Sequence, residues 1–259
     1  MRFCALASGS SGNCIYVSSG ETSLLVDAGI SGKKIEAGLC DIGVAPESIK
    51  GVLVTHDHTD HTQGAAIFAN KYGIPIYATE GTLMYIRQHA RTSPKMFIVV
   101  PDKGFALGDI NIMPFRTSHD ALDPIAYTLC AEGKKLGMAT DLGIYDDYTI
   151  EHLTGCDALY IEANHDVNML MLGSYPYPLK VRIRSEMGHL SNDECAELIR
   201  KVRHDGLKAV VLAHISKENN FAELAYETVR LDMEQDDRFG QMPKLLIAKR
   251  HETSDMVEL

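Results

Sequence analysis

The chain has 259 residues, of which 45% are hydrophobic and 23% are charged. This balance is that of a folded globular protein and excludes disordered, collagen-like and coiled-coil rod classes. Lys and Arg number 25 against 35 Asp and Glu, so the formal net charge is -10. The surface as a whole therefore repels polyanions, and a polyanionic substrate has to be held locally, by a metal or a small basic area.

The cysteines and the apolar runs indicate in which cellular compartment the protein is located. Six cysteines are scattered without a C-x-x-C pair, each within or beside an apolar stretch: Cys4, Cys14, Cys40, Cys130, Cys156 and Cys195. This pattern predicts buried, reduced thiols. The N-terminal apolar run is too short for a secretory signal, and no run approaches the roughly 20 residues of a membrane span. We expect a cytoplasmic protein without a membrane partner.

Short runs rich in β-formers, bounded by turn residues, predict strands along the whole chain. They fall at residues 3–6, 14–17, 23–26, 51–54, 74–78, 110–115, 126–130, 135–139, 158–161, 209–212 and 245–248. The run at 51–54 is predicted to be a buried strand, and the first histidines of the chain follow it directly. A helix is expected near residues 33–39.

Two further helices have start signals in the second half. Ser191 with Glu194 forms a capping box before apolar residues at helical spacing, and Asn220 with Glu223 gives a similar start. The acidic stretch Asp232–Asp237 is interpreted as a solvated helix end. Because strands and helices interleave without a linker, we expect one α/β domain over 1–259, with sheets covered by helices.

Four potential metal ligands follow the strand at 51–54 within six residues: His56, His58, Asp60 and His61. A loop at a strand end can turn the first pair one way and the second pair another, which suits two adjacent ions. Shuffled chains of this composition give this spacing roughly once in a thousand. Surface or capping histidines are the alternative interpretation.

Three more candidates follow predicted strands, where α/β proteins commonly place ligands. They are His119, Asp141 and His214. Each alone is a weak signal, since a single His or Asp after a strand is more often structural. Together with the first cluster they supply ligands for two ions and a shared carboxylate.

In these seven candidate ligands and in Asp27, the chain resembles the metallo-β-lactamase superfamily over residues 1 to about 251. The resemblance implies an αββα sandwich, with mixed sheets covered by helices on both outer faces and metals at one edge. It also implies that one ion takes His56, His58 and His119, that the other takes Asp60, His61 and His214, and that Asp141 bridges them. Asp27 would orient the ligand loop.

Two divalent ions can lower the pKa of a bridging water and stabilise both the attacking and the leaving oxygen of an in-line displacement. A phosphodiester suits this chemistry, with Asp60 and Asp141 carrying negative charge to the ions. Zinc or manganese is expected, with iron as a further choice, because imidazole and carboxylate ligands accept all three. The scattered cysteines give no reason for a Cys/His nucleophile.

Three segments resemble the YycJ/WalJ branch of the superfamily, which is associated with 5′→3′ exonuclease activity on DNA. They are Ser8–Asn13, Glu162–Asp166 and Arg184–Ser191. The resemblance implies DNA with a free 5′ end as the partner. The larger RNA-processing relatives carry an additional domain for which this chain has no room. The sequence leaves oligomeric state open, a homo-oligomer included.

Several residues are candidates for holding the substrate: Ser10, Asn13, Asn164, His165, Arg182, Arg184 and His189. His189 precedes the capped helix and could hold a phosphate or protonate the leaving oxygen; a packed loop histidine is the alternative. Lys180, Arg182 and Arg184 alternate, which on a strand would place all three on one face. Tyr175 and Tyr177 could stack bases, although a packed loop or dimer contact is the favoured interpretation.

Two other classes of function remain open. A small-molecule hydrolase for thioesters or lactams would use the same metal core. A non-catalytic module that binds nucleic acid or regulates a partner would keep the metals for structure. The second is disfavoured because a structural zinc site is closed with four ligands, whereas seven ligands over two ions leave a bridging position open.

Overall fold

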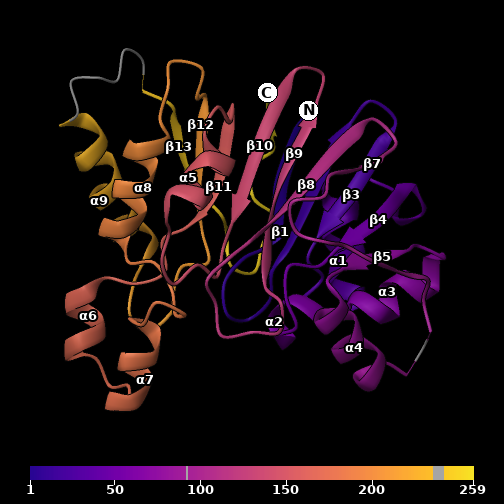
Figure 1. Ribbon diagram of the computed structural model, residues 1–259, viewed down its shortest axis with the longest axis horizontal. Helices are drawn as coiled ribbons and strands as arrows, with labels where there is room; N and C mark the ends of the chain where they lie inside the picture. The colour runs from indigo at the N-terminus through magenta and orange to yellow at the C-terminus, as the bar shows by residue number, and fades with distance from the viewer. Residues whose placement is uncertain (92, 236–241) are drawn as a thin grey trace. The chain divides into compact units, whose positions relative to one another are not determined.

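The computed structural model describes residues 1–91, 93–235 and 242–259. Within them the strands form two mixed seven-stranded sheets (Figure 1). The first sheet has the order β14-β1-β2-β3-β4-β5-β6 and the second has the order β13-β12-β11-β10-β9-β8-β7. This arrangement with its flanking helices confirms the expected α/β class.

The first sheet combines antiparallel and parallel pairing. Its strands are β1 (Arg2–Ala7), β2 (Cys14–Ser19), β3 (Thr22–Val26), β4 (Ile49–Leu53), β5 (Ile76–Ala78), β6 (Met96–Ile98) and β14 (Val257–Glu258). Strands β1, β2, β3 and β14 pair antiparallel, whereas β3 to β6 run parallel. The carboxyl ends of β3 and β4 therefore lie at the same edge of the sheet.

The second sheet shows the same combination. Its strands are β7 (Phe105–Leu107), β8 (Ile110–Arg116), β9 (Ile125–Ala131), β10 (Lys134–Ala139), β11 (Ala158–Glu162), β12 (Ala209–Ala213) and β13 (Lys244–Ile247). Strands β10 to β13 are parallel neighbours. Both β11 and β12 are buried along their whole length, as is typical of parallel strands covered on both faces.

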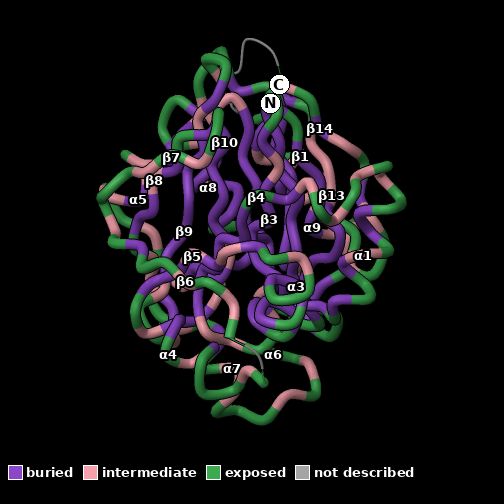
Figure 2. The backbone as a smooth tube through the Cα atoms, turned by 90° about the vertical axis from the view of Figure 1, so that its right-hand side faces the viewer, coloured by how far each residue is buried: buried purple, intermediate pink, exposed green. Residues whose placement is uncertain are grey.

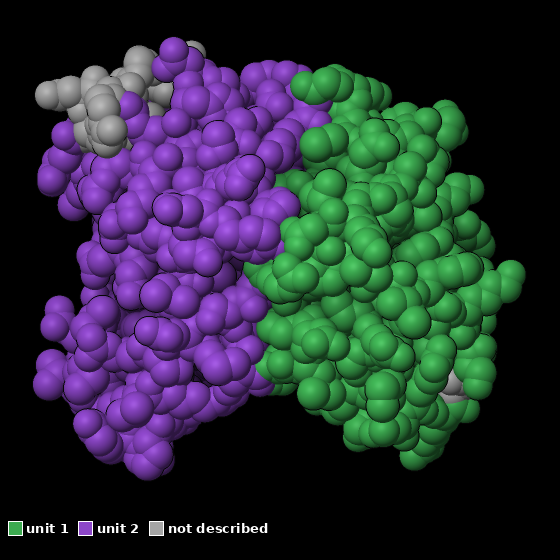
Figure 3. Space-filling model, viewed as in Figure 1, with its two compact units in different colours: residues 1–116, 121–133, 249–259 green, residues 117–120, 134–248 purple. Residues whose placement is uncertain are grey.

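The chain divides into two compact units, which Figure 3 colours separately. Unit 1 comprises residues 1–116, 121–133 and 249–259, and unit 2 comprises residues 117–120 and 134–248. The single domain over 1–259 stays a prediction.

Unit 1 carries its helices around the first sheet. They are α1 (Gly32–Asp41), the short 3-10 helix η1 (Pro46–Ser48), α2 (Thr59–Thr62), α3 (Ala65–Tyr72) and α4 (Glu80–His89). Ile35 and Leu39 of α1 and Phe68 of α3 are fully buried in one cluster with residues of β1 to β5. Figure 2 shows the strands of this core in the colour of buried residues. Packing of these helices on the sheet fixes the strand ends from which the first histidines start.

In the sequence of unit 2, helices connect the successive parallel strands. They are α5 (Asp147–Leu153), α6 (Val167–Leu172), α7 (Tyr177–Ile183), α8 (Asn192–Val202) and α9 (Ala222–Glu234). Helix α8 begins at the predicted capping box, in which Ser191 and Glu194 bond each other's backbone N–H groups. Its apolar face, Cys195, Leu198, Ile199 and Val202, is buried as the spacing predicts.

The strands expected from sequence are all present, with ends shifted by up to two residues, and α1 is confirmed. The elements without a sequence prediction are mostly too short to show periodicity, such as the three-residue β6 and β7 and the four-residue α2. Asp236 and Asp237 of the acidic stretch lie outside the described residues. Over the described part of the chain, no helix is long and apolar enough to cross a membrane.

Two local predictions are wrong. Helix α9 is capped by Phe221 rather than Asn220, because the Asn220 amide instead donates to the carbonyls of Ala163 and Asn164. The six cysteines, all within the described residues, form no disulfide bond, as expected, but Cys40 is exposed and Cys130 half-buried. Cys40 lies on the outward face of α1, which its neighbouring apolar residues did not reveal.

The buried face of α8 provides a test of this packing. Leu198 is 0% exposed, whereas Leu172 at the end of α6 is 88% exposed. We expect Leu198→Ala to lower the free energy of unfolding by about 2–5 kcal/mol, because it leaves a cavity. Leu172→Ala should change it by less than about 0.5 kcal/mol. Urea denaturation of the two variants measures the difference, and equal losses would contradict the packing of α8.

Candidate metal centre

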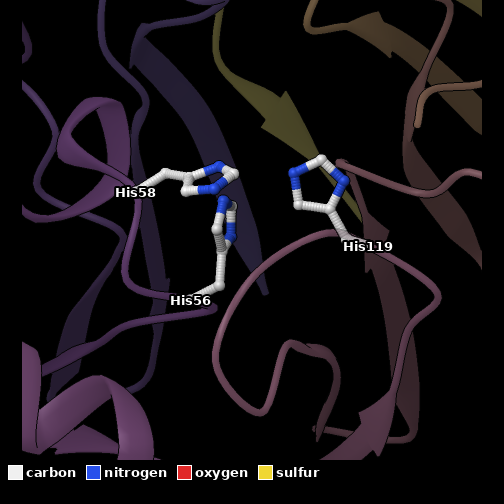
Figure 4. Close-up of side chains that lie close together, drawn as sticks. All are labelled: His56, His58 and His119. Atoms are coloured by element: carbon white, nitrogen blue, oxygen red, sulfur yellow. The ribbon is translucent and has the colours of Figure 1, made fainter. Parts of the chain in front are cut away.

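The first cluster of candidate ligands follows β4 in unit 1. The ring centroids of His56 and His58 lie 4.7 Å apart in an edge-on arrangement, and those of His56 and His61 lie 4.1 Å apart. Figure 4 shows the rings of His56 and His58 next to each other. His56 and His61 are buried. The side chain of Asp60 is 24% exposed, with Oδ2 at 3.6 Å from His61 Nε2.

Asp27 anchors this cluster from the end of β3. Its Oδ1 accepts hydrogen bonds from the backbone N–H of Thr55 at 2.9 Å and from the Thr55 hydroxyl at 3.0 Å. Its Oδ2 lies 2.8 Å from His61 Nδ1. The Thr55 oxygen also lies 3.0 Å from His56 Nδ1. One buried carboxylate thus orients two imidazoles, one directly and one through a hydroxyl.

The loop of the first cluster is held at its backbone as well. Asn13 donates its backbone N–H to the carbonyl of Asp60 at 2.8 Å, and its Nδ2 lies 3.0 Å from His61 Nε2. Gly29 passes so close that a Cβ on it would lie 1.6 Å from the Asp60 carbonyl oxygen. Glycine is therefore required at position 29 for this approach.

A second cluster of candidate ligands lies in unit 2. Asp141 Oδ1 is 3.7 Å from His119 Nε2 and 3.6 Å from the Nδ1 atoms of both His189 and His214. Figure 4 labels His119 on the loop that follows β8. Asp141, Glu162, His189 and His214 offer ligand atoms within 4.8 Å of one another. Imidazole and carboxylate donors at this spacing can hold a divalent cation.

Glu162 is the buried charge of unit 2. It ends β11 and is 0% exposed. Its Oε2 accepts the backbone N–H groups of Leu142 and Leu190, each at 3.1 Å, and its Oε1 lies 2.9 Å from His189 Nδ1 and 2.7 Å from His214 Nδ1. Burial works to raise the pKa of Glu162, but the two imidazoles outweigh it and lower the pKa to about 2. The group is therefore an ionised acceptor.

The acceptors beside the histidines decide which ring nitrogen carries a lone pair. Three candidate ligands have Nδ1 near a protein oxygen: His61 with Asp27 at 2.8 Å, His119 with the Gly188 carbonyl at 3.0 Å and His214 with Glu162 at 2.7 Å. Carbonyl and carboxylate oxygens only accept, so Nδ1 carries the hydrogen and the neutral ring has its lone pair on Nε2. Burial, the largest influence, lowers the pKa of His119 and favours this neutral form. Metal-binding histidines are oriented in this way.

Strand ends and backbone conformation place the key side chains. Asp27, Asp141 and His214 follow β3, β10 and β12, and all three have positive φ, at 61°, 55° and 50°. Residues other than glycine rarely adopt this left-handed region, and such backbone concentrates at functional sites. The sharp turn after each strand keeps the side chain at the carboxyl edge of its sheet.

The predicted basic strand is a helix, which corrects one expectation. Pro178 stands in the first turn of α7, where its fixed φ favours a helix start. Residues 180, 182 and 184 therefore do not share one face. Lys180 caps α6 by donating to the carbonyls of Met171 and Gly173. Arg182 pairs with Asp120, and Arg184 reaches the sulfur of Met171.

The remaining substrate candidates fall into exposed and buried groups. Ser10 is exposed on its loop. Asn164 and His165 are buried, and the Asn164 amide donates to the His214 carbonyl at 2.9 Å. Burial lowers the pKa of His165 to about 4. Tyr177 is 70% exposed, and the roles of all these residues at a substrate stay predictions.

Sequence reasoning did not assign roles to Thr55, Asp120 or Glu162. Asp120 has its Oδ1 at 3.5 Å from His119 Nε2 and accepts from Arg182. Glu162 could have been identified from the sequence. It is the charged residue at the end of the otherwise uncharged strand β11, and a buried charge needs partners. Thr55 and Asp120 adjoin predicted ligands but belong to residue types that are common in any loop.

Comparisons with known proteins identify a family and relatives to which this chain is similar. A family model described as beta-lactamase superfamily domain matches residues 22–215. The chain is 40% identical over 242 residues to exodeoxyribonuclease WalJ of Streptococcus pneumoniae serotype 2, covering 91% of this chain and 89% of that protein. It is also 40% identical over 239 residues to exodeoxyribonuclease YycJ of Bacillus anthracis, covering 91% and 90%.

Solved structures show likeness in fold. The metallo-beta-lactamase fold protein YhfI of Bacillus subtilis matches with a TM-score of 0.74 at 18% identity, over 99% of this chain and 98% of that one. Zinc-bound PqqB of Methylobacterium extorquens matches with a TM-score of 0.73 at 16% identity, over 100% of both chains. The two sheets and their helices are therefore those of this fold.

The contacts of Glu162 lead to a first prediction about the centre. Glu162→Gln keeps the shape of the side chain but removes the charge that fixes His189 and His214. We expect affinity for divalent metal to fall about 10–100-fold, measured by competition with a chelator. Glu151→Gln on the exposed side of α5 is the matched control. Unchanged affinity in Glu162→Gln would show that this carboxylate does not orient ligands.

Gly29 leads to a second prediction. Gly29→Ala must push the Asp60 carbonyl away, and we expect it to cost about 1–3 kcal/mol of unfolding free energy through overpacking and to weaken metal binding. Gly32→Ala is the control, since its Cβ would meet only Ile67 at 3.7 Å. Urea denaturation and metal titration compare the two, and equal behaviour would contradict the close approach at Gly29.

Proposed function

Because this chain belongs to the metallo-β-lactamase superfamily and, within it, to the family of WalJ and YycJ, we propose that it is a metal-dependent exodeoxyribonuclease. The observation that carries this proposal is 40% identity to two proteins named exodeoxyribonucleases over 91% of the chain. The oriented imidazoles and carboxylates support it, because such groups bind divalent metal ions and bound metal ions promote hydrolysis of phosphodiesters.

The proposed centre would hold two divalent ions, zinc or manganese, with iron as a further choice. We assign His56, His58 and His119 to one ion, Asp60, His61 and His214 to the other, and Asp141 to both. The support is the family membership together with the Nε2 lone pairs set by oxygens at Nδ1. Such ions supply Lewis-acid stabilisation of phosphate oxygens and lower the pKa of water.

Residues of the chain itself have defined tasks in this proposal. Asp27 and Glu162 hold the protons on Nδ1 of the ligand histidines, so that the rings do not turn. Burial works to lower the pKa of His189, but the Glu162 and Asp141 carboxylates outweigh it and raise the pKa. His189 therefore keeps its Nδ1 proton, which it donates to Glu162 in a hydrogen bond. It can deliver a second proton, from Nε2, to the leaving oxygen.

The proposed substrate is DNA with a free 5′ end. A net charge of -10 does not favour polyanions in general, so recognition is local. Arg184 and Ser10 are exposed candidates for phosphate contacts. Asn164 and His165 are buried, and we assign them to positioning the His214 loop and the start of α8. Six cysteines that form no disulfide bond in the described residues support a reducing cytoplasm as the location.

Loss of the shared carboxylate gives the sharpest prediction for this function. Asp141→Ala is expected to lose hydrolysis of a 5′-phosphorylated single strand by at least about 10³-fold, because it removes the ligand assigned to both ions. Asp205→Ala in an exposed turn is the control. End-labelled oligonucleotides, followed over time, measure the rate. Cleavage retained by Asp141→Ala under tight control of contaminating metal would overturn the assignment.

The choice of metal is tested on the same substrate. Full-length protein stripped with a chelator should be inactive, and zinc, manganese or iron added singly should restore activity to different extents. Labels on either end of the strand distinguish 5′→3′ from 3′→5′ digestion. Products that shorten from the 3′ end would contradict the proposed polarity.

A further inference from the structure

Helices α6 and α7 of unit 2 have no task yet in the proposed function. Figure 1 shows the two helices together at one end of this unit. Lys180 of α7 joins them, since its ammonium donates to the carbonyls of Met171 and Gly173 at 2.8 and 2.7 Å. The Arg184 guanidinium adds a contact between Nη1 and the Met171 sulfur at 3.7 Å. The two helices are therefore held together as one element.

One face of α7 is turned to solvent and combines an aromatic ring with cations. Tyr177, Lys180, Val181 and Arg184 follow the spacing i, i+3, i+4 and i+7, so they share this face. Tyr177 is 70% exposed, and Val181 and Arg184 are also exposed. Ile183, on the opposite side of the helix, is buried. Packing of the opposite side thus keeps this face, which we call the α7 face, accessible.

The charge around the α7 face is opposite to that of the whole chain. Residues 167–187 carry three Lys or Arg side chains against one carboxylate, that of Glu186, whereas the chain has a net charge of -10. Arg182 pairs with Asp120, while Lys180 and Arg184 bring their charges to the α7 face. Two copies of this face would repel each other, whereas a polyanion is attracted to it.

The α7 face leads to a residue of the proposed reaction. The His189 backbone N–H donates to the Ile183 carbonyl, at the end of α7, at 2.9 Å. Tyr177 and Arg184 are seven residues apart, which is about 10 Å along the helix. Stacked nucleotides of one strand are spaced by about 3.4 Å. A strand that extends from His189 along α7 therefore reaches Tyr177 after about three nucleotides.

An unpaired DNA strand matches this combination of groups. Aromatic side chains bind single strands by stacking on the faces of the bases, and cations contact the phosphates between them. Tyr177 offers such a ring, with the exposed Val181 side chain beside it on the same face. In a duplex the neighbouring base pairs cover the faces of the bases, so the same ring has no surface to stack on along the helix.

We propose that the α7 face binds unpaired nucleotides of the DNA strand, with a base stacked on Tyr177 and a phosphate at Arg184. The proposal rests on the proposed function, which places a strand end at His189. The contact lies away from the reacting atoms, so it acts on KM rather than on kcat. It also gives the protein a preference for single strands over double strands.

The experiment uses full-length, metal-loaded protein and a short, fluorescently labelled single strand of DNA with phosphorothioate linkages, which resist hydrolysis. Fluorescence anisotropy measures binding. Tyr177→Ala should weaken it about tenfold, and Tyr177→Phe, which keeps the ring, should recover most of this loss. Arg184→Gln should reduce the slope of log K against log salt concentration by about 0.7, because it removes one phosphate contact to a single strand.

Lys201→Gln is the control for the loss of a cation. Lys201 is exposed near the end of α8. This helix begins at Ser191, beside His165, and runs back toward the start of β12. Lys201 therefore lies at the opposite edge of the second sheet from α7, and its variant should keep the affinity and the salt dependence of the wild type.

Strand length and pairing provide two further arms. In hydrolysis of unmodified single strands, Tyr177→Ala should raise KM about tenfold for strands longer than about four nucleotides. The ratio of KM values should fall toward one for dinucleotides, which are too short to reach Tyr177. A duplex of the same sequence should be bound without dependence on Tyr177. An equal rise of KM for dinucleotides and long strands would overturn the placement of the base.

The outcomes separate this inference from the proposed function. Binding of single strands that is unchanged in Tyr177→Ala and Arg184→Gln overturns the inference, even where DNA is hydrolysed. Weaker binding in both variants, together with no hydrolysis of unmodified DNA under any metal, supports the α7 face and overturns the exonuclease.

Sedimentation tests a second copy of the chain as the occupant of the α7 face. A dimer that Tyr177→Ala converts into a monomer, with unchanged binding of DNA, would overturn the inference. Urea denaturation checks that each variant is folded, and Arg184→Gln keeps the test decisive where Tyr177→Ala is destabilised.

Discussion

Two buried carboxylates, one in each unit, are the constraint on which the candidate centre depends. Asp27 is 1% exposed and Glu162 is 0% exposed, and a buried charge is tolerated only where it is paired or hydrogen-bonded. Asp27 is satisfied by Thr55 and His61, and Glu162 by two backbone N–H groups and two imidazoles. The same bonds that make the charges tolerable fix the ring orientation of the histidines.

The parallel pairing of strands explains why the candidate ligands of unit 2 come from strand ends. Parallel strands bring their carboxyl ends to one edge of a sheet, so β10, β11 and β12 deliver Asp141, Glu162 and His214 to neighbouring positions. Left-handed backbone at Asp141 and His214 turns the chain immediately after the strand. Backbone strain at such positions is tolerated where the surrounding structure fixes it, and here the buried strands on either side do so.

The charge distribution reconciles an acidic protein with a polyanionic substrate. Positive side chains near the candidate ligands are largely engaged: Arg182 pairs with Asp120, and Lys180 caps α6. Because the chain carries a net charge of -10, the proposed recognition of nucleic acid is local and does not involve the surface as a whole.

The sequence by itself determined the positions of the strands, the capping box at Ser191 and the identity of the histidine cluster, since local patterns and short spacing carry these. It did not determine that residues 177–183 form a helix, because a Pro in a first helical turn and a strand-like alternation give opposite signals. The packing of sheets and helices alone decided that Glu162 holds two imidazoles and that Gly29 touches Asp60. Such contacts join residues that are distant in the chain, so no local sequence pattern indicates them. An unpaired charge or an added Cβ destabilises the protein only where the folded core buries it.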